Sequence, residues 1–252
     1  MEAIIGTAGW TIPTRERTFF PEEGSSLERY AARFRGVEIN SSFHRPHRAS
    51  TWQRWAESVP ENFRFSAKLP KTITHQAKLV DCDDLVEAFL SDVAPLGAKL
   101  AILLVQLPPS LAFDPAIALP FLERLTRLSP CRIACEPRHP SWFEPEADAS
   151  LASLEVARVA ADPARVAAAA LPGGWRGLGY WRLHGSPIMY RSRYGPERLE
   201  PVARAIAADI EAGRETWCMF DNTASSEATA DALALEQRLA SGGLSPLISP
   251  PR

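Results

Sequence analysis

The feature that most constrains the fold is a regular alternation of short apolar runs with longer amphipathic segments along the whole 252-residue chain. Runs rich in β-branched and other apolar residues predict strands, and the segments between them have the spacing of surface helices. Strands are predicted over residues 3–9, 36–42, 63–69, 100–107, 132–137, 156–161, 178–184 and 215–221. The clearest helical segments cover residues 26–34, 84–96, 115–128, 198–213 and 225–239.

Strand and helix units at this rhythm predict an α/β fold of the TIM type, a (β/α)8 barrel with parallel strands inside and helices outside. That barrel typically takes about 250 residues, so we expect one TIM-barrel domain over residues 1–252. No linker, repeat or break in composition divides the chain. The alternative is a doubly wound open sheet, whose usual sign is a GxGxxG turn after the first strand. The sequence "GTAGW" at that place lacks it, which favours the barrel.

Composition excludes several classes of protein. Hydrophobic residues make up 46% of the chain and charged residues 23%, as in ordinary globular domains. No apolar run is long enough for a membrane span, and the N-terminus reads as a strand rather than a signal peptide. Four scattered cysteines without a CxxC pair predict a reduced, cytoplasmic protein. A net charge of −2 gives no overall basic field to recruit nucleic acid.

Strand parity predicts which side chains face the barrel axis, because successive side chains point to opposite faces of a strand. In four predicted strands, residues 36–42, 63–69, 132–137 and 178–184, one face is apolar and the other is polar. The apolar face suits packing against the helices, so the polar face is expected to point toward the barrel axis. The inward polar set contains Glu38, Asn40, Ser66, Lys68, Gln106, Glu136, Arg138, Tyr180, Arg182 and His184. These residues lie toward the C-terminal ends of their strands, where barrel active sites are found. We expect one shared cavity there; the alternative is an ion-pair network that only fills the barrel.

Seven short motifs add a resemblance to this picture. They are "GTAGW", "VEINSSFHRP", "RFSAKLPKTITH", "QLPPS", "CEPRHPSW", "YWRLHG" and "FDNT". In this order, from residue 5 to about residue 235, they resemble the YecE-like family, also called domain-of-unknown-function family 72. The resemblance implies a TIM-type barrel and implies no reaction. Family members usually carry Tyr where His44 stands and two Asn where Asp221 and Asn222 stand, so Asp221 adds a carboxylate near the mouth.

The inward residues suit acid–base catalysis. Glu136 and His184 form the predicted catalytic pair, because a Glu beside cations stays ionised and a His titrates near neutrality. Three aromatic residues, Trp10, Trp142 and Tyr190, could offer stacking surfaces to the substrate, although packing in the core is the alternative for each. The predicted substrate-binding residues are Glu38, Asn40, Lys68, Gln106, Arg138, Trp142, Arg182 and Tyr190.

The charge of the substrate follows from the loops after the strands, which are rich in cations: Arg15, Arg17, Arg45, His47, Arg48, Lys71, His75, Lys78, Arg191 and Arg193. Such a rim favours a small anionic ligand that carries a phosphate or a carboxylate. The loop "GSPIMYRSRYG" follows the seventh strand, a common place for phosphate sites in barrels. We therefore predict an enzyme, a hydrolase, lyase or isomerase, that acts on a small anion and needs no cofactor.

Two alternatives stay open. A divalent metal is the first, in a metal-assisted hydrolase or isomerase, since carboxylates and a histidine fall near strand ends: Glu38, Glu136, Asp162, His184 and Asp221. No HxH, HExxH or DxD spacing is present, and the inward cations would compete with a metal, so no residue is assigned as a metal ligand. The second is a non-catalytic binder of nucleic acid or a metabolite. A strong salt dependence of oligonucleotide binding would identify it.

Overall fold

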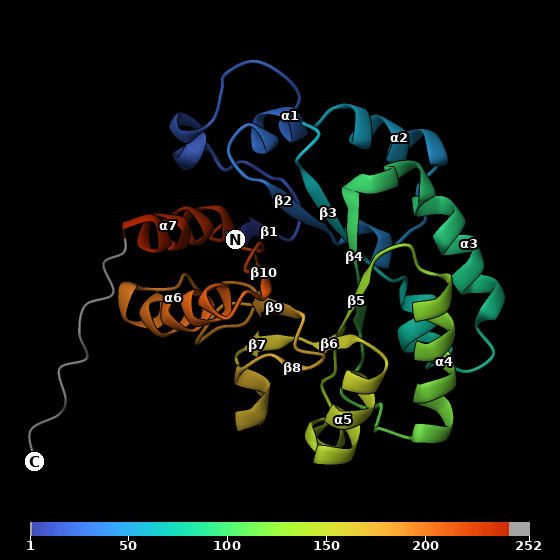
Figure 1. Cartoon of the computed structure of the whole chain (residues 1–252). Coiled ribbons are helices and arrows are strands. Elements are labelled where there is room, and N and C mark those ends of the chain that lie inside the picture. Colours follow the sequence, from blue (N-terminus) through green and yellow to red (C-terminus); the bar gives the residue numbers. More distant parts are fainter. Residues whose placement is uncertain (1, 242–252) are drawn as a thin grey trace, which may run out of the picture.

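The computed structural model describes residues 2–241, and its central feature is a ring of strands enclosed by helices (Figure 1). The strands are β1 (Ile4–Thr7), β2 (Gly36–Ile39), β3 (Arg64–Lys68), β4 (Leu100–Gln106), β5 (Arg132–Glu136), β6 (Val156–Arg158), β7 (Ala160–Asp162), β8 (Gly173–Gly174), β9 (Leu178–Leu183) and β10 (Glu215–Phe220). The helices are α1 (Ser26–Ala31), α2 (Ala49–Glu57), α3 (Asp83–Val93), α4 (Pro115–Leu128), α5 (Pro145–Ser153), α6 (Pro196–Glu211) and α7 (Ala228–Ser241). No helix among these residues is long and apolar enough to cross a membrane.

Two seams close the strands into a barrel. Pairing gives two sheets, with the orders β1-β10-β9-β7 and β2-β3-β4-β5-β6-β8. At one seam Ala8 forms a parallel bridge with Glu38, and the Gly9 N–H donates to the Glu38 carbonyl oxygen at 2.8 Å. At the other, the chain from Val156 to Asp162 pairs with β5 through β6 and with β9 through β7. The ring pairings are parallel, and the short β8 adds one antiparallel pair beside β6. The fold is the predicted TIM-type barrel.

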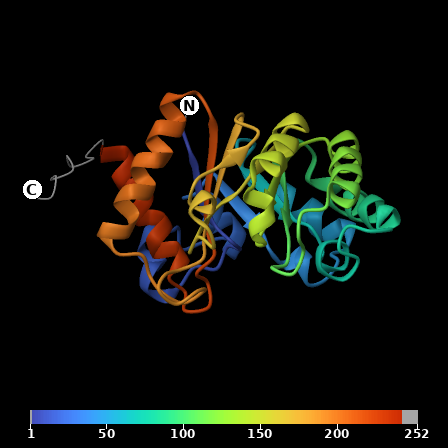
Figure 2. The ribbon, with the colours of Figure 1, turned by 90° about the horizontal axis from the view of Figure 1, so that it is seen from below.

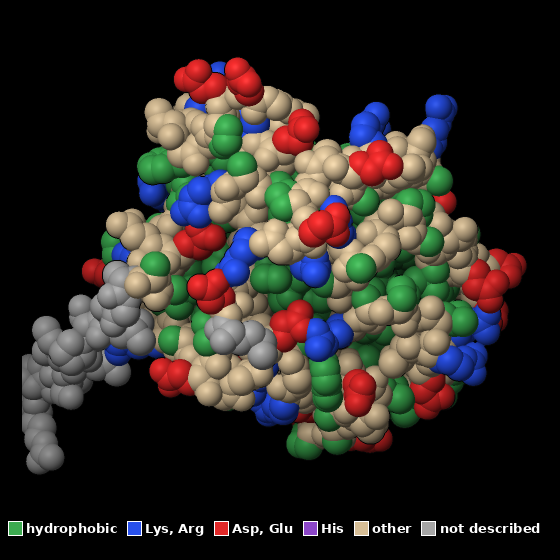
Figure 3. Space-filling view, turned by 45° about the horizontal axis from the view of Figure 1, so that its top comes forward, with side chains coloured by type: hydrophobic (Ala, Val, Ile, Leu, Met, Phe, Trp, Pro, Cys, Tyr) green, Lys and Arg blue, Asp and Glu red, His purple; other side chains and the backbone are tan. Residues whose placement is uncertain are grey.

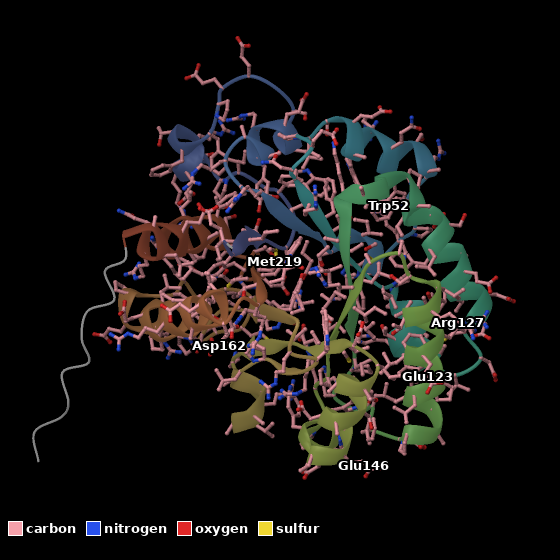
Figure 4. All side chains as sticks on the ribbon, viewed as in Figure 1. Trp52, Glu123, Arg127, Glu146, Asp162 and Met219 are labelled. Carbon is pink, nitrogen blue, oxygen red and sulfur yellow. The ribbon has the colours of Figure 1, made fainter. Side chains whose placement is uncertain are left out.

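The core has two layers that follow the strand alternation. One apolar cluster fills the inside of the ring: Ile102, Leu104, Ala134, Ala157, Val159, Leu178, Tyr180, Trp217 and Met219. The larger cluster takes the other face of the same strands, for example Leu103, Val105 and Ile133, and packs it against the helices. Figure 4 places Met219 in the middle of the ring, while Glu123 and Glu146 project from the outer helices. The predicted parity of β4, β5 and β9 is thus correct.

The apolar inner cluster supports the polar residues, which occupy the next positions along the same strands. In β9 the inward sequence runs Leu178, Tyr180, Arg182 and then His184, from the apolar interior to the strand end. Figure 2 shows the strands upright, with the loops that follow β9 and β10 along the lower edge. We call that end, where the strands finish, the mouth of the barrel. It holds the candidate site.

Candidate functional site

Arg182 is the centre of the site and is fully buried, with 0% of its surface exposed. Its guanidinium binds Glu38 through two hydrogen bonds, from Nε to Oε2 at 2.9 Å and from Nη2 to Oε1 at 2.7 Å. Nη1 donates to Glu136 Oε2, and Nη2 also donates to Asp221 Oδ2 at 2.9 Å. One guanidinium therefore holds three carboxylates from β2, β5 and the end of β10. Burial alone would lower its pKa, but these carboxylates raise the pKa well above its usual value.

His184 lies between two of those carboxylates. Its Nδ1 is 3.1 Å from Asp221 Oδ2, and its Nε2 is 3.2 Å from Glu136 Oε1. Burial lowers the pKa of the imidazole, but Glu136 and Asp221 outweigh it, so the pKa is raised. An imidazolium carries an N–H on both nitrogens, which matches two acceptors on opposite sides of the ring. The site therefore stabilises the protonated, acidic form of His184.

Glu136 is kept ionised by the cations around it. Burial raises the pKa of its carboxyl, but the charges of Arg182, His184 and Arg138 hold that pKa well below its usual value. Arg138 donates from Nε to Glu136 Oε1 at 2.9 Å, so the same oxygen faces both Arg138 and His184. Asp221 follows the same logic, since Arg182 and His184 lower its pKa against the effect of burial. The site thus favours anionic carboxylates beside the protonated form of the histidine.

Below this cluster, Tyr180 links it to the apolar interior. Its hydroxyl lies 2.9 Å from Glu38 Oε2 and 2.8 Å from Ser66 Oγ, and all three side chains are buried. Burial and the charge of Glu38 raise the pKa of the phenol well above its usual value, so it stays neutral. Glu38 Oε2 therefore accepts from the Tyr180 hydroxyl as well as from Arg182 Nε, which fixes the carboxylate.

Three polar side chains at the mouth have few or no hydrogen-bond partners among the described residues. The Lys68 side chain is 6% exposed, and its ammonium makes no hydrogen bond or ion pair with any described residue; Nζ lies 4.0 Å from the centre of the Phe43 ring. Gln106 is 5% exposed, pairs in register with Glu136, and has no side-chain hydrogen bond within residues 2–241. Asn40 donates weakly to Asp221 Oδ1 at 3.4 Å, while its own buried Oδ1 has no partner there. We call Lys68, Gln106 and Asn40 the unpaired set.

The loop from Gly185 to Gly195 covers part of the mouth. Its Tyr190 hydroxyl accepts from both Nη atoms of Arg138 at 3.4 Å, and its ring lies edge-on to His184 with centroids 5.6 Å apart. A cavity of about 20 Å³ beneath it is lined by ten residues, including Glu136, Arg138, His184 and Met189. That volume accommodates about one water molecule.

The predicted convergence of the inward residues is confirmed for most of the set. Glu38, Glu136, Arg138, Arg182 and His184 contact one another directly, and the charge of Lys68 acts on Asp221 in the same cluster. Arg182 was predicted to bind substrate, but its guanidinium binds carboxylates and none of its surface is exposed. In this structure it positions the carboxylates of Glu38, Glu136 and Asp221.

Trp142 was predicted to line the substrate site, but its side chain lies in the hydrophobic core. The indole is 1% exposed, its Nε1 donates to the Leu111 carbonyl oxygen at 2.9 Å, and it packs on Phe113 with centroids 5.0 Å apart. It belongs to the layer between barrel and helices and offers no stacking surface at the mouth. A Trp that follows a strand end in a Pro-bounded turn, "HPSW", folds back into the core here because its N–H finds a backbone acceptor.

Asp221 and Phe43 belong to the site although neither was predicted as a catalytic or substrate-binding residue; Asp221 was considered only as a carboxylate near the mouth and as a possible metal ligand. Asp221 had a detectable signal: in "TWCMFD" it has the same parity as the inward Trp217 and Met219. Phe43 had none, because it sits in a short helical turn, residues 41–43, after β2, where strand parity no longer applies. The exposed His44 contacts Phe43 edge-on, with centroids 5.0 Å apart, and takes no part in the buried cluster.

The rim cations are less free than their number suggests. Arg15 binds Glu16 and Glu227 at 2.8 Å each, and Arg193 lies 3.6 Å from Asp231. Their charges are partly neutralised, and surface pairs of this kind contribute little to binding or stability. The described residues contain no group of three His, Cys, Asp or Glu placed to hold a metal ion. The inward carboxylates are bound by Arg182 instead, so a divalent metal would have to displace a buried guanidinium.

Comparisons with known proteins agree with this architecture. Residues 4–251 match the sequence model of the family described as "Protein of unknown function DUF72". The UPF0759 protein YecE of Escherichia coli strain K12 is 36% identical over 141 residues, 55% of this chain and 49% of that protein. This chain spans about half the length of the curated relatives that it matches.

Two crystal structures extend the likeness to nearly the whole chain. A DUF72 family protein from Enterococcus faecalis V583 is 20% identical with a TM-score of 0.81, covering 95% of this chain and 96% of that one. A DUF72 family protein from Thermotoga maritima MSB8 is 22% identical with a TM-score of 0.77, covering 95% of this chain and 100% of that one. Identities this low show a shared fold and carry no statement about chemistry.

Proposed function

This chain belongs to the DUF72 family, and we propose that it is an enzyme that binds a small anionic substrate at the mouth of the barrel. In this proposal His184 and Glu136 carry out proton transfer. The family gives no reaction, so the proposal rests on the geometry of the site. The observation that carries it is the contrast between the paired cluster around Arg182 and the unpaired set beside it.

The unpaired set supports an anionic ligand. A buried ammonium is costly unless an anion or hydrogen-bond acceptors surround it, yet the nearby carboxylates are taken by Arg182, His184 and Arg138. With His184 protonated, the site has four cationic groups, Arg182, Arg138, Lys68 and His184, against the carboxylates of Glu38, Glu136 and Asp221. A phosphate or carboxylate beside Lys68 would neutralise the excess, and Gln106 and Asn40 would supply hydrogen bonds.

The pair of catalytic residues has complementary protonation states. His184 is held as an imidazolium and can give a proton to a substrate oxygen or carbanion. Glu136 is held as a carboxylate, contacts the same imidazole, and can take a proton back. Asp221 on the other ring nitrogen orients the imidazole and stabilises its charge. Such a pair suits lyases and isomerases that move a proton beside a carbonyl, and hydrolases that protonate a leaving group.

A thermal-shift comparison tests the anion site. Phosphate should raise the melting temperature of the wild type above its value in chloride at matched ionic strength, because a ligand stabilises the state that binds it. The Lys68→Met variant should lose most of this phosphate-specific shift. Lys71→Met, an exposed lysine three residues further on, should keep it. Equal shifts in the wild type and Lys68→Met would mean general salt effects and a cluster that only fills the barrel.

The two alternatives, a nucleic-acid binder and a metal-assisted enzyme, have less support. A nucleic-acid binder would need an extended basic surface, and the face drawn in Figure 3 carries acidic and basic side chains side by side. Metal analysis of the purified protein, with a chelator in a melting experiment, tests the metal-assisted alternative. We place the enzyme in the cytoplasm, a proposal supported by its four free cysteines, of which Cys82, Cys135 and Cys218 are buried.

A further inference from the structure

Lys68 has surroundings that suit a nucleophile better than a structural cation. We infer that its amine forms a Schiff base with the carbonyl group of a small anionic substrate. This inference rests on the proposed function and narrows it to carbonyl compounds that carry a carboxylate or a phosphate. It also assigns Lys68 a covalent role, where the sequence analysis predicted only binding.

The position of Lys68 is well defined at its base and free at its tip. It is the last residue of β3 and points inward, and its carbonyl oxygen accepts from Ser42 Oγ at 2.7 Å. The side chain runs over Phe43, whose ring supports the amine at 4.0 Å from the centroid. No described acceptor binds Nζ, so its lone pair, once the proton leaves, is available to a substrate.

The electrostatic environment favours the neutral amine. Burial and the neighbouring Arg182 lower the pKa of Lys68 to about 8, against the opposing effect of Glu38, Glu136 and Asp221. About a tenth of the protein then carries a neutral Lys68 at pH 7, far more than for a lysine in water. A desolvated lysine beside a fixed cation is a recognised way to make an amine nucleophilic.

A neutral histidine completes the surroundings. His75 lies in the helical segment Thr72–Gln76 after β3, where the backbone forms a π-helical turn of the kind found at functional sites. Its ring lies edge-on to Phe43 with centroids 4.9 Å apart. Burial and the charges of Lys68 and Arg138 lower its pKa, so it remains neutral near pH 7. It can accept the proton that Lys68 releases.

The covalent step balances without a further reagent. Lys68 Nζ, having released one proton, gives its electron pair to the carbonyl carbon. A second proton then leaves the nitrogen and one is taken up by the carbonyl oxygen, which gives a neutral carbinolamine with a lone pair on nitrogen. The nitrogen lone pair then forms the C=N bond as the hydroxyl, protonated by the site acid, leaves as water. Amine, carbonyl and one proton become an iminium ion and one water molecule. The iminium draws electrons from the adjacent carbon, where Glu136 and His184 can exchange a proton.

Reductive trapping tests the inference on the intact chain. The protein is incubated with pyruvate or with dihydroxyacetone phosphate, treated with sodium borohydride, and analysed by mass spectrometry with peptide mapping. We expect one reduced adduct per chain, on Lys68, with a yield that rises between about pH 7 and 9 as the amine loses its proton. Labelling by pyruvate alone would identify a 2-oxo acid, and labelling by dihydroxyacetone phosphate alone a phosphorylated ketone.

Two variants sharpen the result. Lys68→Arg keeps a cation at the mouth but cannot form an imine, so it should lose the adduct and keep the phosphate-induced thermal shift. Lys71→Arg should keep both. Adducts spread over exposed lysines such as Lys71 and Lys78 in the wild type would overturn the inference, even if no variant folds.

The same experiments separate this inference from the proposed function. If no adduct forms while phosphate still stabilises the protein in a Lys68-dependent way, Lys68 binds anions as an ammonium ion. The Schiff base is then wrong and the anion site remains. If phosphate-specific stabilisation is also absent, both proposals fail.

Discussion

At the scale of the residue, the two buried cations Arg182 and Lys68 differ in how their positive charge is stabilised. Arg182 meets three carboxylates with a rigid, planar donor set, and its charge is fully compensated. Lys68 lies over an aromatic ring and makes no ion pair within the described residues, so burial and the charge of Arg182 outweigh the more distant carboxylates. The first arrangement builds the site and the second leaves it open to a ligand. Their substitution should therefore change stability in opposite directions.

Arg182→Met should be strongly destabilising. It removes the guanidinium but leaves Glu38, Glu136 and Asp221 facing one another in a buried space, a loss of about 3–5 kcal/mol for a broken buried pair. Chemical denaturation at pH 7 measures it. The exposed Arg48→Met should change the unfolding free energy by less than about 0.5 kcal/mol. Equal, small changes in both variants would mean that the cluster contributes little to the native state.

Lys68→Met should stabilise the protein at neutral pH. The pKa of Lys68 falls from 10.5 to about 8 on folding, so its charged form is disfavoured by at most roughly 3 kcal/mol. The gain should be constant below about pH 8 and should disappear as the pH rises toward 10.5, where the unfolded chain also loses this proton. Denaturation at pH 7 and pH 10 measures it. A variant that is less stable than the wild type at pH 7 would contradict the assignment of an unpaired charge.

His184 should give the protein a pH dependence of the opposite sign. Its folded pKa is raised, so the stabilisation from its charge is complete below its unfolded pKa of about 6.5 and is lost as the pH rises through the folded value. His184→Gln, which keeps polar groups but cannot ionise, should lose this decline in stability above neutrality. Denaturation profiles from pH 6 to 9 give the comparison. A wild type and variant with parallel profiles would show that His184 does not change its protonation on folding.

At the scale of the element, strand parity predicted the inward residues because it depends only on backbone geometry. It placed Glu136 and Arg182 correctly from β5 and β9 without any knowledge of their partners. The sixth predicted strand, residues 156–161, was less well resolved, since the chain there divides into β6 and β7 and pairs with a different neighbour on each side of Val159. The split into β6 and β7 depends on how the strands close into a ring, so no local sequence pattern could have predicted it.

Two helices were missed in the sequence analysis. α2 begins after Arg48 with no side-chain cap, and α5 begins at the proline of "EPEAD", residues 144–148, with a weakly amphipathic pattern. α2 does have an amphipathic pattern that could have indicated a helix, whereas α5 obtains its stability from packing against the barrel rather than from local signals. The identity of the partners in the site was also beyond the sequence. That Arg182 binds carboxylates from three other strands, and leaves none to Lys68, follows from tertiary distances alone.

The close approach of β1 and β2 requires a glycine at position 6, and this requirement can be tested. A Cβ on Gly6 would lie 2.3 Å from the carbonyl oxygen of Gly36, a contact that the backbone cannot relieve by a rotamer change. Gly6→Ala should therefore cost roughly 1–3 kcal/mol or more, as overpacking does in cores. Gly195→Ala, where no atom lies within 4 Å of the new methyl group, should cost about 1 kcal/mol or less. Equal losses in urea denaturation would contradict the close approach at the seam.

At the scale of the whole molecule, the charge of the chain and the charge of the site differ in sign. The protein carries a net charge of −2, whereas its mouth holds more cationic than anionic groups when His184 is protonated. A local positive site in a weakly acidic protein attracts small anions over a short range without recruiting large polyanions. In our proposal the barrel binds its ligand at this end, beside the loop that carries Tyr190.

The central claim is that this mouth is an anion site, and a crystal structure with tungstate tests it most directly. Tungstate is a tetrahedral dianion like hydrogen phosphate, though somewhat larger, and its anomalous scattering locates it without ambiguity. At pH 7 we expect a strong anomalous peak within hydrogen-bond distance of Lys68 Nζ or the Arg138 guanidinium, and no such peak in crystals of Lys68→Met. A mouth that contains only its own side chains, paired as described here, while tungstate binds elsewhere, would contradict the account.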